Sequence, residues 1–470
     1  MKHRFLFPLI LIGIFFLSIL LNNISTNMIF IGDISWFYLQ ARDMLYTGEI
    51  PQVSIPSSHP WIHQGPFWTY LLSIALFIGR YSPVSGAVLA VMISLITVTV
   101  LFMVTTRLFS KKIGLLTVLL YCTSPLIIIH SRMPYHTTPI PLFTILYLYS
   151  VYLWLTKGSR YFPLIVLFLG ILYNFELATV ILSFHLIFLL GALFFVSREK
   201  IKELFTSKTI GLFLLALLVP LLPMLFYDVS HGFPQTLKFI AWLGYRALLV
   251  LGILESTYQG ESFSTFLSFS GALFQRLLFL PHILGALAIF LLGFWYVIKK
   301  AVEEFRHSKK IGSYTLIASA LTISVGAYVS NRVPSESYTP MLFPLIILSL
   351  ALCFGRALQT KTLMFPSIIG VGLIILLNST TLISHNYLMG KGEVYGPTLE
   401  DRKKVVESIL YQVDGKPYTL KAEGPGSEFE SFTINYEYLA WYLGHAPSKE
   451  KTSNVFMISD VNGEVRVRKL

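Results

Sequence analysis

Residues 84–112 of the chain read VSGAVLAVMISLITVTVLFMVTTRLFSKK, an apolar stretch that carries no charge until the basic residues Arg107, Lys111 and Lys112. A bilayer core about 30 Å thick is crossed by roughly 20 apolar residues in a helix. Backbone groups in lipid must find hydrogen-bond partners within their own segment, so the stretch predicts a transmembrane helix. Because positive residues gather on the cytoplasmic side of a membrane, we expect this helix to end there.

The same pattern recurs along the 470 residues of the chain. Hydrophobic residues make up 54% of the sequence and charged residues only 13%, whereas a soluble domain carries about a quarter charged residues. We therefore predict an all-α polytopic membrane protein with about eleven transmembrane helices. The predicted spans are residues 5–22, 84–106, 113–130, 138–156, 162–175, 178–196, 209–227, 277–298, 311–330, 339–357 and 362–384.

The basic residues between these spans agree with a single topology. All clusters fall on one side of the membrane, and one misplaced helix would invert every later cluster. The first apolar block lacks a small-residue cleavage site after it, so we interpret it as a helix and not as a signal peptide. We expect the protein in the cell (plasma or inner) membrane, with a cytoplasmic N-terminus. The clusters are Lys2/Arg4, Arg107/Lys111/Lys112, Lys157/Arg160, Arg198/Lys200/Lys202/Lys208, Lys299/Lys300/Arg306/Lys309/Lys310 and Arg356/Lys361.

Two domains are predicted: a membrane domain over residues 1–384 and a small external α/β domain over residues 385–470, with two or three strands and one or two helices. Residues 66–80 are apolar but short, and a span there would break the alternation of the basic loops. We interpret them as a helix lying in the outer interface, within a long external loop over residues 23–83. Residues 228–276 form a second long external loop. Long loops are usually functional, so the working face is predicted to be external.

Several other function classes are disfavoured by the composition. The net charge of +12 lies mainly in short loops between apolar blocks, as topology requires, and does not indicate nucleic-acid binding. Cys122 and Cys353 fall inside predicted spans, so no disulfide is expected. No internal repeat is evident, which weighs against an inverted-repeat transporter.

Acidic residues are scarce in the membrane domain, so their positions are informative. Asp33, in IFIGDISWFYLQARDML, lies about ten residues beyond the first span. A carboxylate at the bilayer surface could deprotonate an incoming hydroxyl or amine. Asp33 also precedes an apolar periodic run, where an aspartate commonly caps a helix. Spacing alone leaves both interpretations open.

Other ionisable residues lie at predicted external helix ends. Glu176, in ILYNFELATV, is at the tip between two spans, where it could line a wet cavity or make a structural hydrogen bond. Arg132 and Arg332 could bind a lipid phosphate, since guanidinium binds phosphate through two parallel hydrogen bonds. The alternative is contact with lipid headgroups. His136 follows Arg132 in the motif HSRMPYHTTP.

Asp228 and His231, in FYDVSHGFPQT, are three residues apart. They could pair with each other or hold a divalent metal ion, which two ligands alone predict only weakly. No phosphate-binding glycine loop, HExxH or GxSxG motif is present. We predict no certain cofactor.

Several motifs and their order along the chain resemble those of the GT-C superfamily of membrane glycosyltransferases. The most similar members are the protein O-mannosyltransferases and the bacterial aminoarabinose transferases that act on lipid A. The resemblance covers most of residues 1–360. The motifs are the GD of the first outer loop, QARDMLYTGEIP, HPWIHQGPFWTYL, SRMPYHTTPIPLF, FYDVSHGFPQT and SESYTPMLFPLIILSLAL.

The resemblance implies transfer of a sugar from a polyprenyl-phosphate donor on the external face, with inversion, to a lipid, glycan or protein acceptor. In that superfamily the first-loop Asp is the essential acid, which corresponds to Asp33. Many members follow this residue with Glu, where this chain has Ile34. The aminoarabinose transferases have Glu-Lys where this chain has His63 and Gln64, so that second carboxylate and lysine are not carried over.

His63, Tyr135 and Tyr338 lie within these motifs and are further substrate-binding candidates, together with Arg132, His136, Glu176, Asp228, His231 and Arg332. The alternative function is a lipid-linked sugar flippase without catalytic activity, which predicts internal symmetry and mid-span charges. A membrane scaffold whose tail binds partners is a third possibility, against which the acidic first loop argues.

Overall fold

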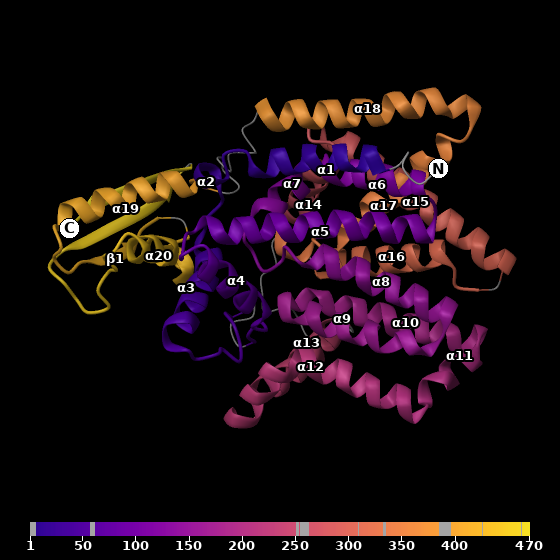
Figure 1. Cartoon of the computed structure of the whole chain (residues 1–470), viewed down its shortest axis with the longest axis horizontal. Coiled ribbons are helices and arrows are strands. Elements are labelled where there is room, and N and C mark those ends of the chain that lie inside the picture. Colours follow the sequence, from indigo (N-terminus) through magenta and orange to yellow (C-terminus); the bar gives the residue numbers. More distant parts are fainter. Residues whose placement is uncertain are drawn as a thin grey trace.

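The structure is a computed structural model. It describes residues 6–56, 62–250, 253, 263–308, 310–331, 335–384, 396–424, 426–461 and 463–470. Long helices run side by side in one bundle, and a small sheet with two helices lies at one end of it (Figure 1). The helices of the bundle are α1 (Leu6–Leu21), α5 (Val84–Leu108), α6 (Lys111–Cys122), α7 (Pro125–Arg132), α8 (Ile140–Lys157), α9 (Phe162–Phe175), α10 (Ile181–Val196), α11 (Arg198–Lys202), α12 (Ser207–His231), α13 (Pro234–Val250), α14 (Phe263–Leu278), α15 (Ile283–Ser308), α16 (Ser313–Asn331), α17 (Leu342–Ala357) and α18 (Lys361–Ser384).

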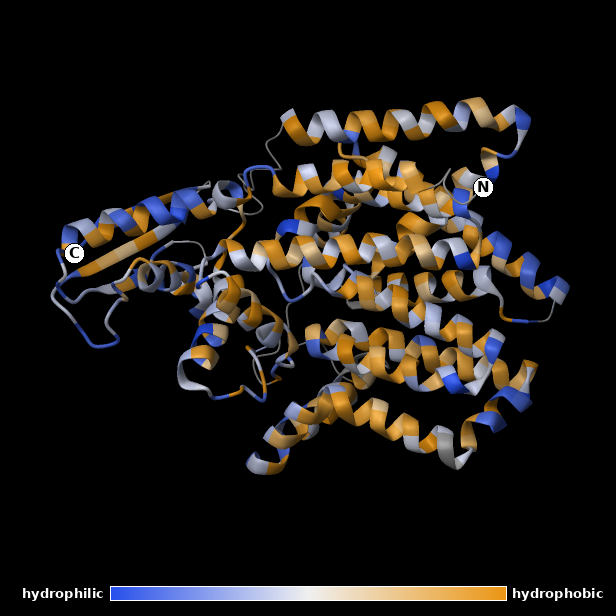
Figure 2. Cartoon of the chain, in the orientation of Figure 1, coloured by the Kyte–Doolittle hydropathy of each residue, from blue (hydrophilic) through white to orange (hydrophobic). Residues whose placement is uncertain are grey.

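The predicted fold class is confirmed by these helices. Within the described ranges, seven helices are long and apolar enough to cross a membrane, and the bent pair of α6 and α7 makes up to eight. The shorter apolar helices α1, α9 and α17 account for the remaining predicted spans. Apolar residues, in orange, run along most of the bundle, whereas hydrophilic residues, in blue, gather at helix ends and in the C-terminal domain (Figure 2). The chain is a multi-pass membrane protein.

Two predicted spans are wrong in detail, and proline explains both. Residues 113–130 were predicted as one helix, but α6 and α7 meet at an angle of 72°. Pro125 has no N–H and disfavours the helical conformation of the residue before it, so the helix breaks there. Residues 277–298 were predicted as another span, but α14 ends at Leu278 and α15 begins at Ile283. Pro281 lies between them and has the same effect.

The two predicted long loops contain helices. The loop over residues 23–83 holds α2 (Ile24–Asn27), α3 (Gly32–Thr47) and α4 (Phe67–Ile78). Helix α4 is the segment predicted to lie in the interface, and its 12 residues are too few to span a bilayer core. The second predicted loop, over residues 228–276, contains the end of α12, all of α13 and most of α14.

The basic loops meet at the end of the bundle opposite the sheet. Lys200 donates a hydrogen bond to the carbonyl of Leu155, and Ser313 donates one to the carbonyl of Leu108. The start of α1 lies at the same end (Figure 1). The basic loops were predicted to lie on one side of the membrane, and the packing agrees, because they lie at one end of the bundle.

The C-terminal part contains helix α19 (Leu399–Val413), helix α20 (Ile434–Tyr442) and a sheet in the order β1-β2-β3. Strands β1 (Thr419–Ala422) and β2 (Val455–Val461) are parallel, and β2 pairs with β3 (Glu464–Lys469) in antiparallel register. A small C-terminal α/β domain is thereby confirmed. Its predicted start at residue 385 stays a prediction, because residues 385–395 lie outside the described ranges.

Candidate functional site

Asp33 lies in the first turn of α3, at the end of the bundle that carries the C-terminal domain (Figure 1). The residue at the N-cap is Ile31, in an extended conformation, and no side chain caps the helix. The capping interpretation of Asp33 is therefore wrong. Its carboxylate, partly buried, has no hydrogen bond or ion pair among the described residues. A carboxylate at a helix N-terminus interacts favourably with the helix dipole.

Tyr135, in the loop between α7 and α8, lies beside Asp33. Desolvation raises the pKa of the Tyr135 phenol well above its ordinary value, and the Asp33 carboxylate raises it further. Glu176 and Tyr338 act in the same direction, whereas Ser337 opposes them. The phenol therefore stays protonated and can donate a hydrogen bond. Three predicted site residues from separate elements thus lie close enough to Tyr135 to raise its pKa.

His136 and Glu176 form a buried pair behind Tyr135. The Nε2 atom of His136 is 3.1 Å from a Glu176 oxygen and 3.2 Å from the side-chain nitrogen of Gln64. The ring of Phe37, from α3, packs on the imidazole at a centroid distance of 5.1 Å. Because one ring nitrogen carries at most one hydrogen, the tautomer of His136 decides whether Nε2 donates to Glu176 or accepts from Gln64.

The segment that carries Gln64 is held tightly against α9. A Cβ on Gly65 would lie 2.1 Å from the Oδ1 atom of Asn174, so only glycine allows this approach. Asn174 is itself fixed, because its side-chain nitrogen donates to the carbonyl of Pro220 at 2.8 Å. His63 turns away from this cluster, with Nδ1 at 3.0 Å from the carbonyl of Ser54.

Arg132 is a buried cation at the end of α7, with 4% of its surface exposed. Its Nη2 atom donates to the carbonyl of Asn22 at 2.8 Å. Its Nε and Nη1 atoms have no partner in the described part of the chain. Buried polar atoms are almost always hydrogen-bonded in folded proteins. An anion that accepted from Nε and Nη1 would satisfy both.

Further buried side-chain atoms are also unpaired. Nδ1 of His136, Oε1 of Gln64 and Nδ1 of His130 are buried without a partner among the described residues. Leaving such an atom unpaired costs about 1–3 kcal/mol. Two of these atoms belong to the cluster around Glu176, and the third is on α7, two residues before Arg132. Buried unpaired atoms of this kind are typical of a site that a polar ligand completes.

A cluster of polar contacts, mostly buried, holds the helical turn η5 (Glu336–Tyr338). One carboxylate oxygen of Glu336 is 2.6 Å from Nε2 of His130, and the other is 2.7 Å from Nη2 of Arg276. Glu336 thereby ties the turn to α7 and α14 and brings Ser337 and Tyr338 next to Tyr135. His130 and Arg276 were not predicted as site residues. The only sign of them in the sequence is that each is an ionisable side chain inside or beside an apolar block.

Asp228 and His231 have different partners. Asp228 is buried, and its two oxygens accept from the backbone N–H groups of Gln235 and Thr236 at 2.7 and 2.9 Å. It therefore caps α13. The exposed ring of His231 stacks on Tyr227 at 4.2 Å. No group of three His, Cys, Asp or Glu residues within the described ranges could hold a metal ion.

The structure thus brings together Asp33, Tyr135, His136, Glu176 and Tyr338 from the predicted set. Arg132 contacts the end of α1, His63 and Asp228 are joined through Gln235, and His231 lies apart. Arg332 lies outside the described residues. Gln64 was noted in the sequence only as a departure from a motif, and its contact with His136 is an addition from the structure.

A family model described as dolichyl-phosphate-mannose-protein mannosyltransferase matches residues 58–227. The matched segment includes Gln64, Arg132, Tyr135, His136 and Glu176. No curated protein sequence matches the chain.

Solved membrane-protein structures share the fold. ArnT from Cupriavidus metallidurans bound to undecaprenyl phosphate has 10% sequence identity and a TM-score of 0.59, over 96% of this chain and 92% of that chain. The same protein in the apo state has 8% identity and a TM-score of 0.61. Archaeal oligosaccharyltransferase AglB from Archaeoglobus fulgidus, in complex with an inhibitory peptide and a dolichol-phosphate, has 12% identity and a TM-score of 0.59. The match covers 93% of this chain and 64% of AglB. At such identities the likeness establishes the fold.

Proposed function

We propose that this membrane protein, which has the GT-C fold that its motifs predicted, transfers a sugar from a polyprenyl-phosphate donor to an acceptor at the end of the bundle carrying the C-terminal domain. The observation that carries the proposal is the Asp33 carboxylate, which has no partner among the described residues and lies beside Tyr135. A general base must be ionised and within hydrogen-bond reach of its proton. A carboxylate without internal partners is available for that task.

The donor class is supported by two independent features. ArnT and AglB are described with undecaprenyl phosphate and dolichol-phosphate bound, and both share this fold. In this chain, Arg132 has two unpaired guanidinium nitrogens, which suit the oxygens of a phosphate. Among the cations that the structure describes, we assign Arg132 to binding of the departing phosphate.

The proposed reaction is one inverting displacement. Asp33 takes the proton of the acceptor hydroxyl or amine as that atom attacks the anomeric carbon. The bond between this carbon and the phosphate oxygen breaks, and the polyprenyl phosphate leaves with the bonding electrons. Arg132 stabilises the negative charge on the leaving phosphate, while Tyr135 donates a hydrogen bond to the substrate. The energy comes from the sugar–phosphate bond itself.

Mass spectrometry of lipid and glycan extracts tests this function. Cells that lack the protein should lose one glycosylated product, which the wild-type chain restores and the Asp33→Asn variant does not. Purified wild-type protein and variant should both bind undecaprenyl phosphate. If Asp33→Asn restores the product fully, the protein is not a transferase that uses this base, and the flippase alternative gains support.

The orientation of the bundle is a separate prediction from the basic loops. Reporter fusions after residues 110 and 200 should report a cytoplasmic position, and a fusion after residue 395 an external one. A cytoplasmic signal at residue 395 would place the site on the wrong side of the membrane for an external acceptor.

A further inference from the structure

We propose that the C-terminal domain holds the catalytic carboxylate in place, with Gly32 and Asn435 as positioning residues. The inference rests on the proposed role of Asp33. Two elements of that domain, the turn η7 (Glu430–Thr433) and helix α20, lie against the start of α3. Asp33 therefore receives its position partly from residues some 400 positions later in the chain.

The C-terminal domain approaches the bundle closely at Gly32, the first residue of α3 and the neighbour of Asp33. A Cβ at this position would lie 1.8 Å from the carbonyl oxygen of Ser431 and 2.6 Å from its carbonyl carbon. Both are backbone atoms of η7, so no side-chain rotation could relieve the clash. Gly32 has no positive φ, and its own conformation does not demand glycine. The contact with the C-terminal domain does.

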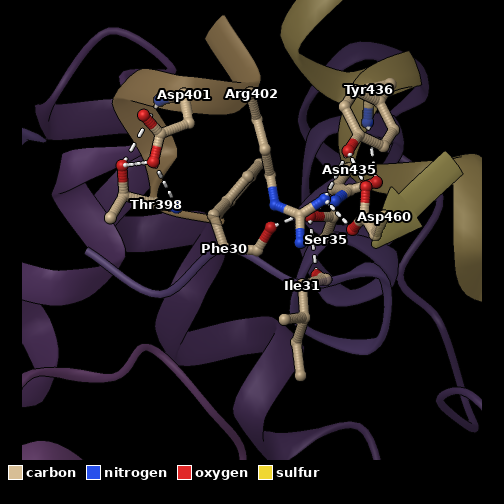
Figure 3. A network of polar contacts seen from close by, with 9 residues as sticks. All are labelled: Phe30, Ile31, Ser35, Thr398, Asp401, Arg402, Asn435, Tyr436 and Asp460. Carbon is tan, nitrogen blue, oxygen red and sulfur yellow. Dashed lines mark hydrogen bonds and ion pairs between the residues drawn. The ribbon is translucent and has the colours of Figure 1, made fainter. Parts of the chain in front are cut away.

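Asn435 makes the polar part of the contact (Figure 3). The residue is buried, with 1% of its surface exposed, and its side-chain nitrogen donates to the carbonyl of Phe30 at 3.2 Å. Its oxygen accepts from the backbone N–H of Tyr436 at 3.0 Å, which fixes the amide orientation. The segment leading into α3 is held further by Leu399, whose N–H donates to the carbonyl of Met28 at 2.9 Å.

The elements that make these contacts are tied to one another. Arg402, from α19, pairs with Asp460 of β2 at 2.7 Å and donates to the hydroxyl of Tyr436 at 2.6 Å. The Tyr436 hydroxyl in turn donates to Asp460 at 2.6 Å (Figure 3). Helices α19 and α20 and the sheet are thereby linked through one buried cation. A rigid body of this kind can fix a backbone segment that it touches.

An apolar contact completes the interface. The buried ring of Tyr438 packs against Phe30 and Tyr38 at centroid distances of 5.9 and 5.1 Å. Its hydroxyl donates to the carbonyl of Tyr81 at 2.7 Å. The C-terminal domain thus reaches both the start of α3 and the turn after α4. A small displacement of this interface moves the carboxylate of Asp33 relative to a substrate bound in the bundle.

Two variants test the proposal in the full-length protein. Gly32→Ala forces η7 and α3 apart, and Asn435→Asp replaces the amide donor with an oxygen that repels the carbonyl of Phe30. A misplacement of about 1 Å can lower a rate by about 100-fold, so Gly32→Ala should lower product formation by about that factor. Undecaprenyl phosphate should bind as tightly as it does to the wild type, because Arg132 is untouched. Asn435→Asp should lower the rate in the same way but less.

Matched controls exist in the chain. Gly13→Ala adds the same methyl group where no atom lies within 4 Å. Asn454→Asp removes an amide donor that reaches the carbonyl of Pro417 at 3.3 Å, in the same domain but away from α3. Both should retain normal product levels.

A double variant that carries Gly32→Ala and Asp33→Asn distinguishes a positioning role of Gly32 from a general loss of structure. If Gly32 acts through Asp33, Gly32→Ala should cause little further loss in the Asp33→Asn background. Full additivity would overturn the proposal, as would normal activity of both Gly32→Ala and Asn435→Asp. If Gly32→Ala fails to reach the membrane, Asn435→Asp decides. Normal activity of Asp33→Asn alone would instead refute the proposed function.

Discussion

Replacement of Asp33 by Asn distinguishes a chemical from a structural role, because the structure makes the structural cost small. The Asp33 carboxylate has no hydrogen bond to lose among the described residues, and asparagine has nearly the same shape. The remaining structural contribution is its interaction with the dipole of α3, about 0.3–1 kcal/mol. We therefore expect the free energy of unfolding to fall by no more than about 1 kcal/mol.

The expected effect on the reaction is much larger. Loss of a general base slows a reaction by about 10²–10⁴-fold, which is about 2.7 kcal/mol or more of transition-state stabilisation. The variant should reach the membrane at normal levels and lose at least two orders of magnitude in product formation. The measurement is product per unit of protein in membranes, with mass spectrometry as the readout.

Asp43→Asn is the control on the same helix. Asp43 is exposed and pairs with the adjacent Arg42 at 2.5 Å, an interaction that contributes little to stability. It should retain most of the activity. Near-normal activity of Asp33→Asn at normal abundance would refute the assignment. The base would then be sought at Glu176, since Asp228 is occupied as the cap of α13.

Three further substitutions probe other charged residues of the predicted site and its support. Arg132→Ala should weaken binding of undecaprenyl phosphate by about tenfold or more, the scale of a lost charge-assisted hydrogen bond; an unchanged dissociation constant would assign Arg132 to headgroup contact. Glu176→Gln should lower activity by about tenfold with little change in abundance, and normal activity would leave Glu176 with a structural role only. Glu336→Gln leaves the buried guanidinium of Arg276 without its carboxylate and should destabilise the protein by about 3 kcal/mol, seen as a lower Tm in detergent; an unchanged Tm would contradict a stabilising role for this pair.

The sequence determined most of the fold because membrane insertion depends on local properties. A run of apolar residues long enough for the bilayer predicts a helix whatever it packs against. The basic loops added the alternation between sides, and the exclusion of residues 66–80 as a span followed from that alternation. Bends were missed at Pro125 and Pro281, although their residue type is a local signal.

The sequence also singled out Asp33, but it could not separate a base from a cap. The two roles differ in which residue stands at the N-cap, and α3 begins two residues earlier than the capping interpretation required. A sequence pattern locates the start of a helix only to within a few residues. In this chain the first residue of α3, Gly32, packs against the backbone of Ser431, a contact that the local sequence does not reveal.

Which side chains meet was decided by the tertiary structure alone. His130 and Glu336 are 206 residues apart and bonded at 2.6 Å, and Asn435 reaches Phe30 across 405 residues. Sequence spacing predicts neighbours on one helix, because a helix has a fixed period. Contacts between elements depend on how the faces of many helices pack together. The free energy of that packing depends on all helices of the bundle together, so it cannot be predicted from any single stretch of residues.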